Sequence, residues 1–154
     1  MSPACRSEDR ADKARILFLC TGNSCRSQMA EGFARALKSA EVEAWSAGVE
    51  RHGLNPLAVQ VMAEAGVDIS GQSSKLVEEL PTLEFDWVVT LCGHANENCP
   101  FFPGPVRRLH KGFDDPPTLA AGAATQEEAL APYRRVRDEI QAFVEGLPGS
   151  LTTG

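Results

Sequence analysis

The stretch that decides the fold joins an apolar run, a polar loop and the start of a helix: Leu17-Phe18-Leu19-Cys20-Thr21-Gly22-Asn23-Ser24-Cys25-Arg26-Ser27. The run at residues 15–19 is too short for a helix and suits a buried parallel strand. Beyond the loop, Met29, Phe33 and Leu37 recur every four residues, which predicts the apolar face of a helix. The stretch therefore predicts a strand, a loop and a helix in direct succession.

Apolar runs and helix signals alternate along the rest of the chain. Further strands are predicted at residues 42–46, 85–91 and 106–109. Further helices are predicted at residues 56–66, 74–80 and 126–143. Asn55 and Thr125 are suitable N-caps for the first and the last of these helices. Because strands alternate with helices, we expect one α/β domain with a mainly parallel sheet and helices on both faces.

Length and charge limit the possible functions. The 154 residues suit one domain, which we place at residues 14–147, between a disordered tail at 1–13 and a flexible end at 148–154. The net charge of −6 disfavours binding to nucleic acid or to an anionic membrane. No apolar run approaches the about 18 residues of a spanning helix, and the N-terminal tail lacks the pattern of an export signal. We therefore expect a cytoplasmic protein, and we expect a monomer.

Five cysteines stand out, because stable disulfides are rare in the cytoplasm. They are Cys5, Cys20, Cys25, Cys92 and Cys99. In that compartment they favour redox or metal chemistry, although the alternative is that they are small buried hydrophobic residues. Cys5 lies in the tail and Cys25 is expected to point into the core, so we assign neither of them a role as a nucleophile.

The loop after the first strand suits a thiolate that attacks a tetrahedral oxyanion. The strand delivers Cys20 to the carboxyl edge of the sheet, where ligands bind in open α/β folds. Backbone N–H groups and the N-terminus of the next helix can surround an anion, and Gly22 permits the positive φ that such a loop needs. Arg26 adds a bidentate donor, and Ser27 can donate to the cysteine sulfur.

These charges and donors should lower the pKa of Cys20. The groups expected to bind the anion belong to Thr21, Gly22, Asn23, Ser24, Cys25 and Arg26. The alternative is a tight turn whose cysteine is merely buried. The loop is not an ATP-type phosphate loop, because it lacks the Gly-Lys-Ser/Thr ending.

A second candidate lies in the long Pro-, Ala- and Gly-rich stretch at residues 112–125. Near its start, Phe113-Asp114-Asp115-Pro116 offers a carboxylic acid that could protonate an oxygen leaving the anion. The alternative is a solvated turn, since Asp-Pro is a common turn pair. Beside a cysteine–arginine loop we favour the acid.

The third candidate is the pair Cys92 and Cys99, directly after the strongest predicted strand. This position brings Cys92 to the same sheet edge as Cys20 if their strands are neighbours. On an intact helix or strand the pair would not reach the Cα separation of about 5.5 Å in a disulfide, so a relay between them needs a conformational change. The alternatives are a structural role, or a metal site with His94 and His110, although the spacing does not match that of usual zinc ligands.

These segments resemble the thioredoxin-coupled arsenate reductases, which share the fold of the low-molecular-weight tyrosine phosphatases. The resemblance covers about residues 15–144 and rests on residues 17–32, Ser46-Ala47-Gly48, Val88-Val89-Thr90-Leu91-Cys92, Asn98-Cys99-Pro100 and Gly112-Phe113-Asp114-Asp115-Pro116. It implies a four-stranded parallel sheet flanked by helices, with the anion loop between the first strand and the first helix.

The resemblance also implies the chemistry. The implied catalytic residues are the nucleophile Cys20, the oxyanion clamp Arg26, the thiolate-supporting Ser27, the general acid Asp115 and the relay cysteines Cys92 and Cys99. The implied substrate is arsenate, with phosphate and sulfate as competing anions, and the implied reductant is thioredoxin or a similar protein. We expect no cofactor.

Some members of the family hold a potassium ion beside the anion loop. Asn23, Glu31, Ser46 and Ser73 match that site, but Lys75 stands where a ligand aspartate is expected. We therefore expect no metal in the site. The Lys75 ammonium should take the place of the ion, with the Glu31 carboxylate as its partner.

Two other functions are considered. A low-molecular-weight protein tyrosine phosphatase would hydrolyse a cysteine–phosphate with water and would need no relay, so Cys92 and Cys99 favour the reductase. Tyr133 is the only tyrosine, and the aromatic pair that such phosphatases carry beside the acid loop is missing. A non-catalytic metal or anion sensor is the alternative from another class.

Overall fold

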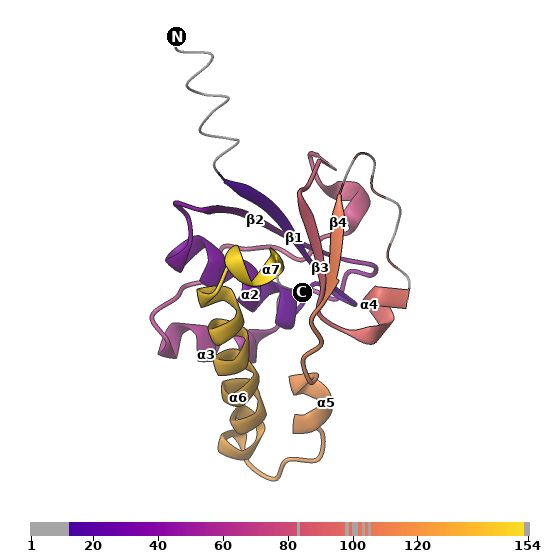
Figure 1. Cartoon of the computed structure of the whole chain (residues 1–154). Helices are drawn as coiled ribbons and strands as arrows, with labels where there is room; N and C mark the ends of the chain where they lie inside the picture. The colour runs from indigo at the N-terminus through magenta and orange to yellow at the C-terminus, as the bar shows by residue number, and fades with distance from the viewer. Residues whose placement is uncertain are drawn as a thin grey trace.

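The computed structural model describes residues 13–82, 84–97, 99, 102, 104 and 106–152. Four parallel strands form one sheet in the order β2-β1-β3-β4 (Figure 1). Their bounds are β1 Ala14–Cys20, β2 Val42–Gly48, β3 Trp87–Thr90 and β4 Arg107–His110. The predicted four-stranded parallel sheet is confirmed.

Helices lie on both faces of the sheet, as predicted (Figure 1). Their bounds are α2 Arg26–Leu37, α3 Pro56–Glu64, the 3₁₀ turn η1 Val77–Glu79, α4 Gly93–Glu97, α5 Pro116–Ala120, α6 Gln126–Glu145 and α7 Gly149–Thr152. A first core cluster packs α2, α3, α6 and α7 against the face that carries Ile16 and Phe18. A second cluster packs η1 and α4 against the face that carries Leu17 and Leu19. Alternate residues of β1 therefore enter opposite cores, which is why residues 16–20 are all apolar and buried.

Two short helices form in segments where the sequence predicted none. α4 begins directly after Cys92, and α5 begins directly after Asp115 in the long loop. Pro116 occupies the first helical position, where its fixed φ is favourable and its missing N–H costs nothing. The helix predicted at 74–80 is shortened to η1, because Leu76 forms a parallel bridge to Gly48 instead.

The two ends of the chain are described to different extents. Residues 1–12, which include Cys5, lie outside the described residues. At the other end, where the sequence predicts a flexible segment, α7 forms and Leu151 is buried in the first cluster. The predicted domain boundaries stay a prediction. None of the helices within the described ranges is long and apolar enough to cross a membrane.

Candidate active site

The anion loop connects β1 to α2, and backbone N–H groups from another segment donate hydrogen bonds to its carbonyl oxygens. The N–H of Glu50 donates to Thr21 O at 2.8 Å, and the N–H of His52 donates to Gly22 O at 3.0 Å. Both donors belong to the segment that follows β2. Because these carbonyls are bonded outward, the loop can present its own N–H groups inward as a nest for an anion.

Asn23 shapes the loop through its backbone and its side chain. Its φ of 48° is the one left-handed conformation outside glycine among the described residues. Its Nδ2 donates to Ser27 Oγ at 2.9 Å, and its Oδ1 accepts from the N–H of Lys75 at 2.8 Å. Asparagine tolerates this conformation better than most residues, so the turn needs no glycine here.

Gly22 is required for close packing. A Cβ at this position would lie 2.2 Å from Nδ1 of His52, so a larger residue would displace the histidine ring. The sequence analysis expected Gly22 to permit a positive φ in the loop, but Gly22 does not adopt one. The positive φ belongs to Asn23, whose side-chain hydrogen bonds stabilise it.

Cys20 and Cys92 are in contact beside the loop. Their sulfur atoms lie 4.0 Å apart, with Cys20 as the hydrogen-bond donor. Cys92 Sγ also lies 3.1 Å from Thr21 Oγ1 and accepts from the N–H of Ala95, in α4, at 3.4 Å. As predicted, the neighbouring strands β1 and β3 bring the two cysteines to one edge of the sheet.

Cys20 donates a hydrogen bond to Cys92, and the pKa values of the two thiols shift in opposite directions, which favours the thiolate on Cys92. The pKa of Cys92 is lowered to about 4, chiefly because Cys20 donates to it, with further donation from Thr21 and Ala95. The pKa of Cys20 is raised well above its ordinary value, because Cys92 accepts its proton and because the thiol is buried. Arg26 acts in the opposite direction but is outweighed. The predicted lowering of the Cys20 pKa is therefore wrong for the paired thiols.

Arg26 and Asp115 form an ion pair next to the loop. Arg26 Nη2 lies 3.2 Å from Asp115 Oδ1, and Arg26 Nη1 donates to Phe113 O at 3.0 Å. Thr118 Oγ1 donates to the second carboxylate oxygen of Asp115 at 2.6 Å. Arg26 Nε is buried and has no hydrogen-bond partner within the described part of the chain. An oxyanion in the loop would supply an acceptor for the guanidinium group.

Cys99 lies beyond α4 and is partly exposed. At about 1.5 Å per residue, the five residues of α4 alone span about 7.5 Å, more than the about 5.5 Å between the Cα atoms of a disulfide. We therefore expect α4 to unwind when Cys92 and Cys99 form a bond, and this rearrangement stays a prediction. Burial raises the pKa of Cys99, while the charge of Arg108 acts in the opposite direction.

Cys25 and Ser27 are both buried behind the loop. Cys25 enters the first core cluster, and burial raises its pKa to about 12, which is unsuitable for a nucleophile. Ser27 Oγ accepts a hydrogen bond from Asn23. Its predicted donation to the Cys20 sulfur stays a prediction.

The alternative metal site gains no support from the geometry. Within the described residues, no group of three or more His, Cys, Asp or Glu side chains could hold a metal ion. His110, one of the four residues considered, instead lies 2.9 Å from Thr90 Oγ1 through its Nδ1.

The family follows from the extent of the match to a known sequence pattern. Residues 15–153 match the model of the low molecular weight phosphotyrosine protein phosphatases. The chain belongs to this family. Among its relatives, an arsenate reductase of Shouchella clausii is 53% identical over 133 residues, which cover 86% of this chain and 94% of the relative. An arsenate reductase of Bacillus subtilis is 54% identical over 125 residues, which cover 81% and 88%.

Solved structures show the same fold in proteins named for different reactions. An arsenate reductase in the phosphate binding state matches this low molecular weight phosphatase-family chain with a TM-score of 0.68 and 32% identity, over 89% of this chain and 98% of the other. An arginine phosphatase from Geobacillus stearothermophilus matches with a TM-score of 0.70 and 26% identity, over 91% and 94%. The fold alone therefore does not separate the two reactions, and the distinction depends on the cysteines.

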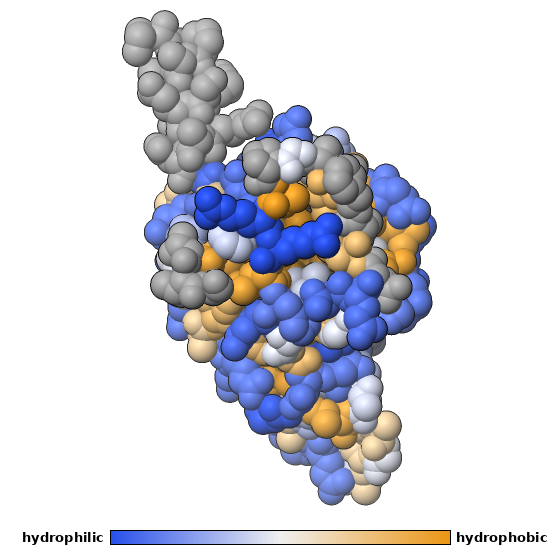
Figure 2. Space-filling view, turned by 45° about the vertical axis from the view of Figure 1, so that its right-hand side comes forward, coloured by the Kyte–Doolittle hydropathy of each residue, from blue (hydrophilic) through white to orange (hydrophobic). Residues whose placement is uncertain are grey.

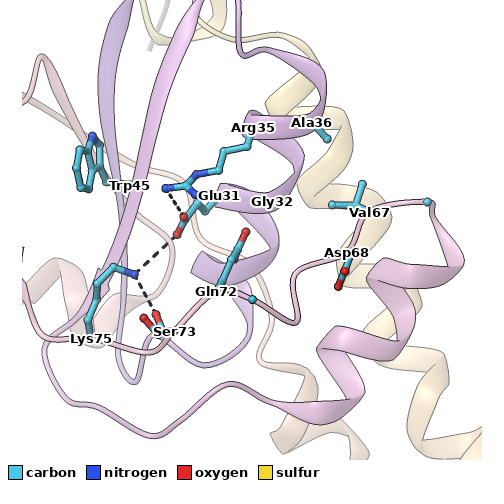
Figure 3. A pocket seen from close by; sticks show the side chains of 12 residues that line it. Glu31, Gly32, Arg35, Ala36, Trp45, Val67, Asp68, Gln72, Ser73 and Lys75 are labelled. Carbon is cyan, nitrogen blue, oxygen red and sulfur yellow. Dashed lines mark hydrogen bonds and ion pairs between the residues drawn. The ribbon is translucent and has the colours of Figure 1, made fainter.

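On the far side of the loop, this phosphatase-family chain buries a carboxylate among cationic groups (Figure 3). Glu31 is 2% exposed, and Ser46 Oγ donates to its Oε1. Arg35 Nη2 lies 2.8 Å from Glu31 Oε2, and Lys75 Nζ lies 4.0 Å from Glu31 Oε1 while donating to Ser73 O at 2.9 Å. Glu31, Arg35, Ser73 and Lys75 line an open pocket of about 550 Å³. The predicted Lys75–Glu31 pair exists, but Arg35 is the closer cation.

Gln28 is the supporting residue that the sequence analysis missed. It is fully buried, and its Nε2 donates to Asn23 O and to Ser73 O, both at 2.9 Å. It thereby ties the anion loop to the segment that carries Lys75. The available signal was a polar residue in the first turn of α2, directly before the core residue Met29.

Proposed function

We propose that this chain is an arsenate reductase that uses three cysteines in succession. The proposal rests on the contact between Cys20 and Cys92, because a phosphatase needs one thiol in its anion loop but no second thiol against it. Relatives named arsenate reductase, at 53% and 54% identity over most of the chain, support the assignment.

The first step is the attack of Cys20 on arsenate held by the loop N–H groups and Arg26. As the sulfur–arsenic bond forms, the Cys20 proton passes to Cys92, which already accepts it in a hydrogen bond. Asp115, as the general acid, protonates the oxygen that leaves as water. The product is a covalent cysteine–arsenate adduct.

The second step is the attack of Cys92 on the Cys20 sulfur. The sulfur–arsenic bond breaks, and its electron pair reduces arsenic from the pentavalent to the trivalent state. The Cys92 proton passes to the departing arsenite, and a Cys20–Cys92 disulfide forms. The sulfur contact of 4.0 Å supports this step, because Cys92 needs little movement to reach its target.

The third step moves the disulfide outward. Cys99 attacks Cys92, α4 unwinds, and the Cys20 thiolate is released as the Cys92–Cys99 bond forms. Thioredoxin, or a protein like it, then reduces this bond. The partial exposure of Cys99 supports its role as the outermost thiol.

The wider setting follows from the sequence. We place the enzyme in the cytoplasm, where a reducing system keeps its thiols available between turnovers. We expect phosphate and sulfate to compete with arsenate, because all three are tetrahedral oxyanions. We propose that it acts as a monomer without a cofactor.

The deciding experiment supplies thioredoxin, thioredoxin reductase and NADPH to the reduced protein. We expect NADPH consumption to depend on arsenate and to match arsenite formation. Hydrolysis of p-nitrophenyl phosphate without arsenate-dependent NADPH consumption would support the phosphatase instead. Metal bound to the reduced protein, with neither activity present, would support the sensor.

A further inference from the structure

β4 forms one edge of the sheet and carries a run of basic side chains. Arg107, Arg108, His110 and Lys111 are all exposed, and we call these four residues the basic edge. The chain as a whole has a net charge of −6, so the basic edge is a local reversal of its charge. In Figure 2, which turns the β4 side forward, strongly hydrophilic side chains lie beside apolar surface.

The register of β4 places one of these arginines on the face of the relay cysteines. Arg108 pairs with Val88, which belongs to the second core cluster together with Cys92. Cys99 packs against the same cluster. Arg107 points to the other face, where its guanidinium lies 5.7 Å from the centre of the Trp87 ring. Because successive strand residues alternate between faces, Arg108 is on the side of the Cys92–Cys99 segment and Arg107 is not.

An electrostatic effect and a chain of hydrogen bonds connect the basic edge to the relay. The positive charge of Arg108 lowers the pKa of the Cys99 thiol, against the raising effect of burial. His110 Nδ1 lies 2.9 Å from Thr90 Oγ1, which in turn donates to Asn96 Oδ1, in α4, at 3.3 Å. A protein that contacts β4 would therefore also lie against the segment in which the outer disulfide forms.

We propose that the basic edge docks the reductant, and that this reductant is a dithiol protein with an acidic face around its reactive cysteine. The proposal rests on the proposed function, which requires a protein to reduce the Cys92–Cys99 bond. An acidic partner is repelled by the net charge of this chain and attracted by its basic edge, so the field orients the encounter. A reductant thiolate then attacks the outer disulfide, and its second thiol resolves the mixed disulfide. Two electrons and two protons pass from the dithiol to Cys92 and Cys99.

The test measures reduction of the oxidised protein by thioredoxin, with thioredoxin reductase and NADPH, at low and high salt. Arg108→Glu reverses the charge beside Cys99, and Arg107→Glu makes the same change on the other face of β4. Lys13→Glu is the matched control, because Lys13 is exposed and precedes the amino end of β1, away from the relay. Dithiothreitol is the second control, because a small neutral dithiol needs no docking surface.

We expect Arg108→Glu to lower kcat/KM for thioredoxin about tenfold at low salt and less than about threefold at high salt. Arg107→Glu should have a smaller effect, and Lys13→Glu should change the value less than about twofold. All variants should be reduced by dithiothreitol at the same rate. The proposal is overturned if Arg108→Glu has no larger effect than Lys13→Glu. It is also overturned if Arg108→Glu slows reduction by dithiothreitol as much as reduction by thioredoxin. If the proposed function itself is wrong, the reduced, unmodified protein will release no arsenite from arsenate. This outcome is separate from any effect of the β4 variants.

Discussion

The sulfur atoms of Cys20 and Cys92 lie 4.0 Å apart, and Cys20 donates a hydrogen bond to Cys92. This contact joins the anion-binding half of the site, between β1 and α2, to the redox half, between β3 and α4. It places the second nucleophile against the first before any substrate chemistry occurs. Cys92 can therefore accept the proton that Cys20 loses in the first step, and it can attack the Cys20 sulfur in the second.

Replacement of the first nucleophile should abolish catalysis. Cys20→Ser should reduce arsenate at a negligible rate, because a serine hydroxyl is far less acidic than a thiol and cannot form the disulfide with Cys92. Any phosphatase side activity should disappear with it. Arsenite release and p-nitrophenyl phosphate hydrolysis measure the two losses, and full turnover by this variant would contradict the site assignment.

The shape of the oxyanion clamp should matter as much as its charge. Arg26→Lys keeps the positive charge but cannot form a bidentate contact to two oxygens. We expect kcat/KM for arsenate to fall by about tenfold or more, which corresponds to at least about 1.4 kcal/mol. Lys13→Glu is a suitable control for the assay, because this exposed residue precedes β1. An unchanged kcat/KM in Arg26→Lys would show that charge alone is sufficient.

The relay cysteines should stop the reaction at different stages. Cys92→Ser should bind arsenate without releasing arsenite catalytically. Cys99→Ser should release one equivalent of arsenite and stall with a Cys20–Cys92 disulfide, because the outward transfer is blocked. Peptide mapping after arsenate treatment identifies that bond. Normal cycling of Cys99→Ser with thioredoxin would mean that the reductant attacks Cys92 directly.

The hydrogen bond from Cys20 to Cys92 predicts how the ionisation of the reduced protein depends on pH. At about pH 6 the reduced protein should carry one thiolate, on Cys92, because its pKa is lowered to about 4. This depressed pKa stabilises the folded state above the ordinary thiol pKa, and the contribution is lost as the pH falls toward 4. Cys20→Ala removes the chief donor, so the Cys92 pKa should rise. Ultraviolet thiolate absorbance against pH measures the shift, and an unchanged titration would contradict the hydrogen-bonded pair.

The cation cluster around Glu31 should replace potassium. Arg35 and Lys75 already compensate its buried carboxylate, and an added cation about 4 Å from either would be repelled by about 4 kcal/mol at an effective dielectric of 20. Activity should therefore be nearly equal in sodium and potassium at matched ionic strength. Lys75→Asp should create potassium dependence. Strong, saturable potassium activation of the unmodified protein would contradict this inference.

The sequence alone predicted the four strands, the three longest helices α2, α3 and α6, and a loop between β1 and α2 that suits an anion. The run before Cys20 predicted a buried strand, which β1 confirms, and the polar residues up to Arg26 favoured a loop that binds an anion over a tight turn. Local periodicity and turn chemistry carry that information, because neighbouring residues determine both. The expected β1–β3 proximity also followed, since parallel strands end at one edge of the sheet.

The tertiary structure decided what depends on residues far apart in the chain. It lowered the pKa of Cys92 and raised that of Cys20, because donors from β1, the loop and α4 converge on the Cys92 sulfur. Arg35 is the nearest cationic partner of Glu31, and the positive φ of the loop belongs to Asn23. A pKa depends on distances and burial in three dimensions, which residue spacing does not specify.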